Sequence, residues 1–552
     1  MLPAVYRVKT ANISTPLQPH QQRVIDKLRA SGGVLVAHSM GSGKGLSSIA
    51  ASEALGLPAD VVTPAPLVEN YQKEMEKHVE GEHPETRIRS YQKAIKGGIN
   101  PNALVIADEA QKMRNVGTAT RALGQQMQHA RARMLLTGTP VYNQPWDVAP
   151  LLNIAAGRDV LPGDPEKFRE HFIGERMVQP PLWQRAIGVR GANVPELKNR
   201  EDLIRAATGY VDVYRGGGEG FPEKRQSYVD VPLTEKQRDI YKYLENPAPW
   251  WLKLKVHYNL PLSKQESTAL NRFYSGVRQA SNTPRPFDTS MTEEEEERTG
   301  KLRAMVERVK TLSRGDPNFK GVLYSNYLSA GIDPLSRMLK KENIPYGVFT
   351  GEVPQGERQR LVDEYNKGKI KALLLSSSGG EGLNLRGTKY MGIAEPHFNE
   401  PKIEQVIGRG VRYKSHEDLP PEERNVQVER FRSVFPEGML NRLGLLKKKT
   451  SIDEFLQSRA EEKSRLSEQI MAALQEASEK GALKSAGLPL TAPPPPSVVP
   501  KIPGVVPPPK LKPPKPTKPL PAAPPPTKER LDVANEESLK RWEKDNKSGI
   551  RE

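Results

Sequence analysis

A glycine-rich turn that ends in lysine is the part of the sequence with the clearest chemistry. The apolar run Val34–Ala37 predicts a buried strand, and Gly41 and Gly43 follow it just before Lys44. Glycines let the backbone turn its N–H groups toward a phosphate, and a lysine at the start of the next helix can reach β- and γ-phosphates. The stretch predicts a phosphate-binding loop (P-loop), with an ordinary strand-to-helix loop as the alternative.

Two positions depart from the usual P-loop pattern. His38 stands where the pattern begins with Gly, and Gly45 stands where Ser or Thr normally supplies a hydroxyl to Mg²⁺. Ser47 and Ser48 are the nearest hydroxyls that could approach the metal instead. A weakened magnesium site is therefore expected.

An acidic pair forms a second candidate group. Asp108 and Glu109 directly follow the apolar run Ala103–Ala107. At the end of a buried strand, one carboxylate can hold Mg²⁺ while the other orients or deprotonates an attacking water. A solvated loop start is the alternative. Thr137 and Thr139 end a third apolar run, and their hydroxyls could sense the phosphate site.

Alternating strands and helices would have to position these groups. In the first half we expect strands at 61–63, 88–90 and 103–107 and helices at 12–31, 44–55 and 67–78. In the second half we expect strands at 321–324, 346–349 and 372–375 and helices at 332–341 and 355–366. Such alternation predicts an α/β fold with two parallel sheets covered by helices.

Composition narrows the class of protein. The 552 residues carry a formal net charge of +17 and a pI near 9.6, which favours a polyanionic partner, with nucleic acid as the leading candidate. With no cysteine and no close-spaced histidines, disulfides and zinc sites are not expected. No apolar run is long enough for a membrane span and the N-terminus lacks a signal-peptide layout, so we expect an intracellular, soluble protein.

Taken in order, the motifs resemble those of superfamily 2 helicases, and specifically the Snf2-like branch. The resemblance spans about residues 15–475. It is carried by LQPHQ (Leu17–Gln21), the P-loop, Thr63–Leu67 with Asn70, Ser90-Tyr91, DEAQ (Asp108–Gln111), LTGTP and the run to Asn153, VDVPLTEKQRDIY (Val229–Tyr241), SSSGGEGLNL (Ser376–Leu385) and QVIGRGVR (Gln405–Arg412). Chain length and the spacing around the last motif resemble the compact helicase-like ATPases of large DNA viruses and phages more than chromatin remodellers.

The resemblance implies two RecA-like parallel-sheet lobes with a mostly helical insertion between them, a C-terminal helix and a disordered proline-rich tail. The expected boundaries are 1–150 for the first lobe, 151–300 for the insertion, 301–450 for the second lobe, 451–485 for the helix and 486–552 for the tail. ATP with Mg²⁺ would bind between the lobes.

The resemblance also implies roles for particular residues. The catalytic set would be Lys44, Asp108, Glu109, Arg409 and Arg412, with Asp108 on the metal. The nucleotide-binding set would be Gln21, Met40, Gly41, Ser42, Gly43, Lys44, Gly45, Gly382, Arg409 and Arg412. The set coupling hydrolysis to nucleic acid would be Thr137, Thr139, Ser376, Gly380 and Gln405. Surface ion pairs are the alternative for the arginines, and a polar helix start is the alternative for Gln21.

Two further stretches are candidates for contacts with partners. Trp250, Trp251, Lys253, Lys255, His257 and Tyr258 mix aromatic and basic groups, as a surface that stacks bases and contacts phosphates would, with core packing of the tryptophans as the alternative. The run Glu293–Glu297 predicts a solvated linker at the lobe boundary. Between Pro489 and Lys528 there are 18 of the 50 prolines, six lysines and no acidic residue. This composition predicts a disordered basic tether that contacts nucleic acid or binds in an SH3-type groove.

The sequence therefore predicts an ATP-dependent motor on nucleic acid, most simply a translocase on double-stranded DNA rather than a strand-separating helicase. A nucleic-acid-binding scaffold with impaired hydrolysis is the alternative that Gly45 raises. A motor subunit of a restriction, repair or viral transcription complex is another. We also predict that Gly45→Thr preserves or raises turnover.

Overall fold

The computed structural model describes most of the chain up to residue 485. The described residues are 12–114, 117–178, 192–217, 220–260, 262, 264–288, 290–298, 300–376, 383–397, 400–438 and 448–485. The chain divides into two units, residues 1–488 and 489–552, and the second lies wholly outside the described residues. The interpretation of the proline-rich tail therefore stays a prediction.

The first lobe is built on a six-stranded parallel sheet. Its order is β3 (Thr86–Ser90), β2 (Ala59–Thr63), β4 (Leu104–Ala107), β5 (Ala132–Thr137), β1 (Gly33–His38) and β8 (Val211–Tyr214). Every residue of β1, β2, β4 and β5 is buried, which explains why most of their side chains are apolar. Because the strands are parallel, the P-loop, the acidic pair and the LTGTP segment all leave the sheet at the same edge.

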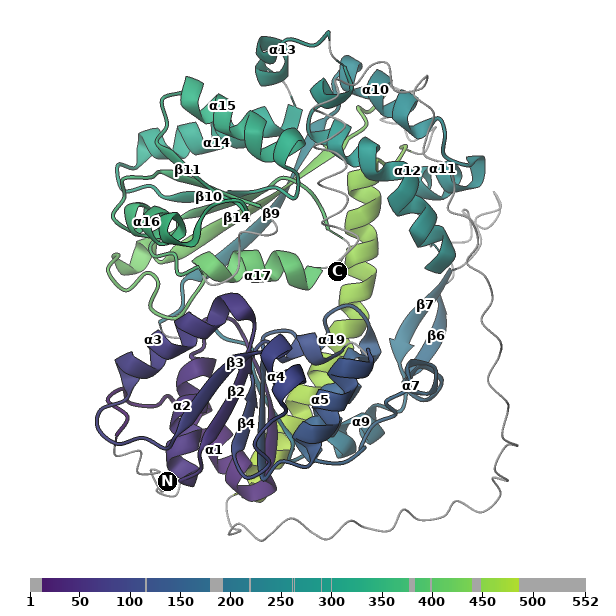
Figure 1. Ribbon diagram of the computed structural model, residues 1–552. Coiled ribbons are helices and arrows are strands. Elements are labelled where there is room, and N and C mark those ends of the chain that lie inside the picture. Colours follow the sequence, from purple (N-terminus) through teal and green to yellow (C-terminus); the bar gives the residue numbers. More distant parts are fainter. Residues whose placement is uncertain are drawn as a thin grey trace. The chain divides into compact units, whose positions relative to one another are not determined.

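The second lobe repeats this plan. Its parallel sheet has the order β11 (Tyr346–Phe349), β12 (Ala372–Leu375), β10 (Gly321–Tyr324), β13 (Tyr390–Ile393), β14 (Asn425–Val434) and β9 (Glu223–Pro232). The two parallel sheets, each with helices packed on it, confirm the predicted α/β fold (Figure 1).

Helices cover both sheets and fill the stretch between them. Those of the first lobe are α1 (Pro19–Ser31), α2 (Lys44–Leu55), α3 (Val68–His78), α4 (Tyr91–Gly97), α5 (Thr118–Gln128) and α6 (Val148–Ala156). The insertion holds α7 (Pro165–Phe172), the antiparallel pair β6 (Ile173–Val178) and β7 (Ala192–Leu197), α9 (Arg200–Ala207), α10 (Glu235–Glu245), α11 (Trp250–His257), α12 (Lys264–Asn282) and α13 (Glu293–Arg298). The second lobe has α14 (Gly300–Gly315), α15 (Asp333–Lys341), α16 (Gln355–Asn366) and α17 (Glu400–Gly410). Short turns are η1 (Ala65–Leu67), η2 (Ala110–Arg114), η3 (Pro145–Asp147), η4 (Arg285–Phe287), η5 (Leu328–Ile332) and η6 (Pro421–Glu423).

A long C-terminal helix, α19 (Ile452–Ser485), connects distant parts of the fold. Near its start, Ile452, Phe455 and Leu456 pack in the core of the inserted helices α10 to α12. Further along, Ile470 and Leu474 are fully buried in the core of the first lobe. Figure 1 shows this helix, in yellow-green, running from the inserted helices down to the first lobe. It confirms the predicted C-terminal helix.

The insertion is less separate than we expected. Its residues 211–214 form β8, which pairs with β1 at the edge of the first sheet, and its residues 223–232 form β9, which pairs with β14 in the second. The chain therefore enters both lobes within the range 151–300 that we assigned to a mostly helical insertion. Both strands lie at sheet edges, where a late strand can be added without rearranging the rest.

The structure corrects the prediction for the glutamate run Glu293–Glu297. The glutamate run is no solvated linker, because it forms α13, where Glu296 and Glu297 are only 4% and 8% exposed. Glu296 bonds Arg337 at 2.5 Å and Glu297 bonds Lys341 at 2.8 Å, so basic side chains of α15 hold this helix on the second lobe.

The tryptophans differ from each other, so core packing explains only one of them. Trp251 packs against the core of the inserted helices, whereas Trp250 is 75% exposed. Lys255 is paired with Glu266 at 2.7 Å, and His257 is buried beside Glu245. Trp250, Lys253 and Tyr258 remain the members of this group that could meet a partner.

Among the helices of the described residues, none combines the length and the apolar character that a membrane span requires.

Candidate active site

The P-loop leaves β1 after His38 and closes onto the start of α2. Gly41 and Gly43 have φ angles of 73° and 76°, a left-handed conformation that other residues rarely adopt, so the two glycines are required by the turn. Lys44 begins α2, and its Nζ donates to the backbone oxygens of His38 and Ser39 at 3.0 Å each. The ammonium therefore lies inside the loop, where a phosphate would be held.

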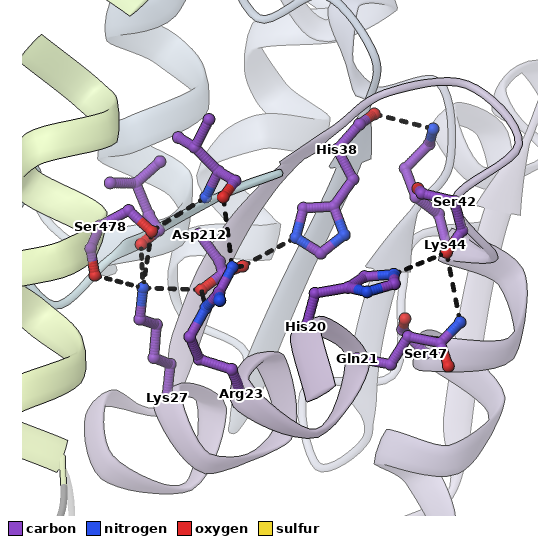
Figure 2. Close-up of polar contacts among 12 residues, drawn as sticks. His20, Gln21, Arg23, Lys27, His38, Ser42, Lys44, Ser47, Asp212 and Ser478 are labelled. Atoms are coloured by element: carbon purple, nitrogen blue, oxygen red, sulfur yellow. Dashed lines mark hydrogen bonds and ion pairs between the residues drawn. The ribbon is translucent and has the colours of Figure 1, made fainter. Parts of the chain in front are cut away.

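Helix α1 supports the loop from beneath. The Gln21 amide donates to Ser42 O and Gly43 O, both at 3.2 Å, and accepts from Gln18 N at 2.9 Å. His20 Nε2 also bonds Ser42 O, at 2.9 Å (Figure 2). Both amide hydrogens of Gln21 are thus used by loop carbonyls, so in this structure Gln21 positions the P-loop, and its direct contact with a nucleotide stays a prediction.

The hydroxyls that follow the loop face away from it. The Ser47 hydroxyl is buried and donates to Gly43 O at 3.2 Å. Ser48 Oγ bonds Gly45 O at 2.8 Å and Tyr71 Oη at 2.7 Å. In this structure both hydroxyls are hydrogen-bonded to backbone carbonyls, and the expectation that one of them approaches a metal stays a prediction.

The acidic pair sits at the end of β4 with defined partners. Asp108 accepts from Thr63 Oγ1 and from Glu109 N, each at 3.0 Å. Glu109 has a φ of 50°, an uncommon value for a residue other than glycine, which marks a strained turn at the carboxylate. Asp108 can serve as a metal ligand because a carboxylate is a favoured Mg²⁺ donor and Thr63 fixes its orientation.

A chain of hydrogen bonds joins Glu109 to the LTGTP segment. Gln111 Nε2 donates to Glu109 Oε2 at 2.6 Å, and Thr137 Oγ1 donates to Gln111 Oε1 at 2.7 Å. Thr139 N in turn donates to Thr137 Oγ1 at 3.0 Å. A shift of the segment at Thr139 would therefore be felt at the Glu109 carboxylate. Gln111 is 5% exposed and was not among the predicted site residues, although it is the fourth letter of DEAQ.

The second lobe brings its arginines to the P-loop. A Cβ built on Gly41 would lie 2.8 Å from both Cβ and Cγ of Arg412, so loop and arginine are in direct contact. Met40 likewise packs on the second lobe, since a Cβ on Gly408 would lie 3.0 Å from its Sδ. Arg409 is 7% exposed. The structure therefore places Arg412 against the P-loop, with the buried Arg409 near it.

Electrostatics confirm that these charges share one site. Burial lowers the pKa of Lys44, while Glu109 and Asp108 act in the opposite direction. Burial also lowers the pKa of Arg412, and neighbouring Arg409 adds to that shift. Burial raises the pKa of Asp108 to about 7, with the charge of Glu109 adding to the rise. A polyanion entering here would relieve the repulsion among the cations.

Two of the predicted coupling residues, Thr139 and Gln405, line a common cavity. A cavity of about 890 Å³ between the lobes is lined by Met40, Gly138, Thr139 and Gln405, but not by Lys44 or the acidic pair. Ser376 is buried at the end of β12. Gly380 and Gly382 lie outside the described residues. The cavity thus joins Thr139 of the first lobe to Gln405 of the second, beside the phosphate site.

A buried ion network supports the loop from β8 and was not predicted. Asp212 accepts from His38 Nε2 at 2.7 Å, from Arg23 at 2.7 Å and 2.9 Å, and from Lys27 at 2.7 Å (Figure 2). Lys27 also donates to Ser478 O of α19 at 2.7 Å. His38, the departure at the start of the P-loop, is therefore explained as a partner of Asp212.

The described residues contain no group of three or more acidic or histidine side chains arranged to hold a metal ion. Magnesium in nucleotide sites is usually held by one or two carboxylates together with water and substrate phosphates, so it does not require such a group.

Two known protein families match parts of the chain. The SNF2-related domain matches residues 85–286, and the helicase conserved C-terminal domain matches residues 301–414. The first match begins after the P-loop and covers the rest of the first lobe and most of the insertion, and the second match falls on the second lobe.

Several relatives come from large DNA viruses. A protein of Acanthamoeba polyphaga mimivirus named as an ATP-dependent RNA helicase is 31% identical over 465 residues, covering 82% of this chain and 94% of that protein. A termination factor NPH-I homolog of African swine fever virus is 25% identical, covering 79% of this chain and 74% of its own length. Among solved structures, the Sulfolobus solfataricus SWI2/SNF2 ATPase core in complex with dsDNA covers 84% of this chain and 97% of its own, at 17% identity and a TM-score of 0.32. A likeness this low adds nothing to the assignment.

Proposed function

The chain belongs to the Snf2-like branch of superfamily 2 helicases, and on that premise we propose that it hydrolyses ATP at the interlobe site to translocate along duplex DNA. It is an ATP-dependent nucleic-acid motor and an ATP-hydrolysing enzyme. One observation carries the proposal for the site: Gly41 of the P-loop lies against Arg412 of the second lobe. Hydrolysis would therefore depend on the lobes being closed.

Each site residue has a role that its surroundings support. Lys44 would hold the β- and γ-phosphates from inside the P-loop. Glu109 would orient and deprotonate the attacking water, with its carboxylate positioned by Gln111. Arg409 and Arg412 would stabilise the charge that develops on the transferred phosphoryl group.

Asp108 would hold Mg²⁺, because its carboxylate stands at the end of β4 with Thr63 fixing its orientation. When bound, the metal neutralises phosphate charge and orients the β- and γ-phosphates for in-line attack.

Coupling to nucleic acid would pass through the hydrogen-bonded chain from Thr139 to Glu109. Thr139 and Gln405 line the same interlobe cavity, so a change in lobe orientation on nucleic acid would move one against the other. Through Thr137 and Gln111 that movement reaches the carboxylate that activates water. This would make hydrolysis faster on nucleic acid than off it.

Duplex DNA is the proposed track, and the positive charge of the chain suits a partner recognised through its phosphates. RNA is the second candidate, favoured by the name of the mimivirus relative. The proline-rich tail would act as a basic tether or recruit a protein partner.

Phosphate release measured against duplex DNA, single-stranded DNA and RNA at one salt concentration tests the track. We expect duplex DNA to stimulate most, and stronger stimulation by RNA would favour the second candidate. A triplex-displacement assay beside a forked-duplex assay tests movement. Unwinding of the forked duplex without displacement of the triplex strand would contradict the translocase proposal. Absence of turnover, with no drop in Glu109→Gln, would overturn the assigned catalytic site.

A further inference from the structure

The space beside Gly45 is filled from another helix. A Cβ built on Gly45 would lie 1.9 Å from Glu74 Oε2 and 3.1 Å from Glu74 Cδ. A hydroxyl oxygen on that Cβ would be one single bond, about 1.5 Å, farther on. The carboxylate of Glu74, which comes from α3, therefore takes up the room that the side chain of Ser or Thr would need after the P-loop lysine.

Glu74 has no other structural task that the fold reveals. Within the described residues it makes no hydrogen bond and no ion pair, and its side chain is open to solvent. The charges that act on it most are those of Arg412, Lys77 and Lys44. Arg412 and Lys44 belong to the phosphate site, so the carboxylate faces the place where the nucleotide would bind.

The chemistry of a carboxylate matches what the loop lacks. Magnesium takes hard oxygen ligands, and carboxylates serve at least as well as hydroxyls. The two serines next in sequence are engaged with Gly43 O, Gly45 O and Tyr71. Of the oxygens described near Gly45, that of Glu74 lies closest to the place of the missing side chain, 1.9 Å from a Cβ built there.

We propose that Glu74 supplies the metal-ligating oxygen that Ser or Thr supplies in other P-loops. The inference rests on the proposed function, since the metal would arrive with ATP at the interlobe site. Glycine at position 45 then leaves the space that the Glu74 carboxylate occupies, because the side chain of any larger residue would compete for it.

Removing the charge of Glu74 has different effects if the carboxylate binds the metal and if it only balances the charges of Lys44 and Arg412. If Glu74 only balances Lys44 and Arg412, it repels the triphosphate, and neutralising it would strengthen nucleotide binding with or without metal. If it binds the metal, neutralising it weakens the metal-loaded complex while leaving the metal-free complex equal or tighter. The sign of the change in the presence of metal decides between the two.

The test uses Mn²⁺ as a paramagnetic probe with the full-length chain. Free Mn²⁺ is measured by electron paramagnetic resonance in the presence of the non-hydrolysable analogue AMP-PNP, and metal-free AMP-PNP binding is measured by calorimetry. We expect Glu74→Gln to weaken Mn²⁺ binding by about tenfold or more. Glu76→Gln, a control on the same helix with an exposed side chain, should leave it unchanged.

A rescue experiment makes the exchange of ligands explicit. Adding Gly45→Ser to Glu74→Ala should restore Mn²⁺ binding, because the hydroxyl then has both the room and the metal to bind. Circular dichroism would show that both variants are folded. Failure of this rescue in folded protein would overturn the proposal, as would Glu74→Gln holding Mn²⁺ as tightly as Glu76→Gln.

Asp108→Asn separates this inference from the one on which it rests. If the native protein retains no Mn²⁺ with AMP-PNP, or if Asp108→Asn changes nothing, the proposed nucleotide site fails. If both behave as expected and Glu74→Gln alone has no effect, only the role of Glu74 fails.

Discussion

The ion network at β8 gives a direct test of how α19 is held on the first lobe. The side chains of Lys27 and Asp212 are fully buried and 2.7 Å apart. Lys27 Nζ also donates to Ser478 O at 2.7 Å and to Ser478 Oγ at 2.9 Å. Replacing Lys27 by Met keeps most of the side-chain volume. It removes the cation beside Asp212 and the hydrogen-bond donor to Ser478 of α19.

The size of the effect follows from what remains. Removing one partner of a buried ion pair costs about 3–5 kcal/mol. Asp212 would still accept two N–H groups of Arg23, at 2.7 Å and 2.9 Å, so we expect the lower end of that range, about 3 kcal/mol. At about 1.4 kcal/mol per factor of ten, local opening would become roughly 100-fold more frequent.

Hydrogen exchange followed by mass spectrometry measures this opening peptide by peptide. We expect faster exchange in β8 and in the part of α19 around Ser478, with little change in the second lobe. Arg23→Met is the matched control, because its side chain is 36% exposed and water can replace it, at a cost of up to about 1 kcal/mol. Adding Asp212→Leu to Lys27→Met should recover part of the protection, since an apolar pair leaves no charge buried. The reasoning is refuted if Lys27→Met exchanges no faster than Arg23→Met.

Further predictions concern catalysis, pH and nucleic acid. Glu109→Gln should lower phosphate release by about 10²–10⁴-fold while fluorescent-nucleotide binding persists, because only the base is removed. Gln111→Ala should lower nucleic-acid-stimulated phosphate release more than basal release, since it breaks the chain of hydrogen bonds that reaches the base. Burial lowers the pKa of His38 from 6.5 to about 4, so the unfolded chain binds the extra proton first and the free energy of unfolding should fall by about 3 kcal/mol as pH drops from 6.5 to 4. Urea unfolding at several pH values measures this change, and we expect the free energy of unfolding of His38→Gln to depend less on pH. Trp250→Ala should leave stability unchanged but weaken single-stranded nucleic-acid binding by about 1–3 kcal/mol if it stacks a base, whereas Trp251→Ala should lower the unfolding midpoint.

The sequence was sufficient for the parts of the fold that have strong local signals. The helix at Lys44–Leu55 and the strands at 321–324, 346–349 and 372–375 have the predicted bounds, because short apolar runs between turn residues allow few alternatives. The strands that close the sheets, β8 and β9, were missed as members of their sheets. The strands with which they pair are far away in the sequence. Because β9 is also largely exposed, neither hydrophobic periodicity nor expected burial predicts that it belongs to the second sheet.

The candidate site shows the same division. The motifs and the family resemblance predicted Lys44, Asp108 and Arg412 as site residues, and the structure brings the three near one another. The importance of Asp212 and Glu74 could not be read from the sequence. A lone aspartate in a strand or a glutamate on a charged helix has no distinguishing pattern, and only the fold brings them to His38 and Gly45. A departure from a motif is the signal that could have prompted the search for such a partner.

Helix α19 also has a consequence for the order in which the protein can fold as it is made. The sheet of the first lobe is complete once β8 has been synthesised, yet one face of that lobe is covered by Ile470, Leu474 and Ala477, roughly 260 residues later. At about 5–20 residues per second, that apolar face waits roughly 13–50 s for its cover. During synthesis the nascent first lobe therefore exposes apolar surface of the kind that chaperones bind, until the residues of α19 have been made.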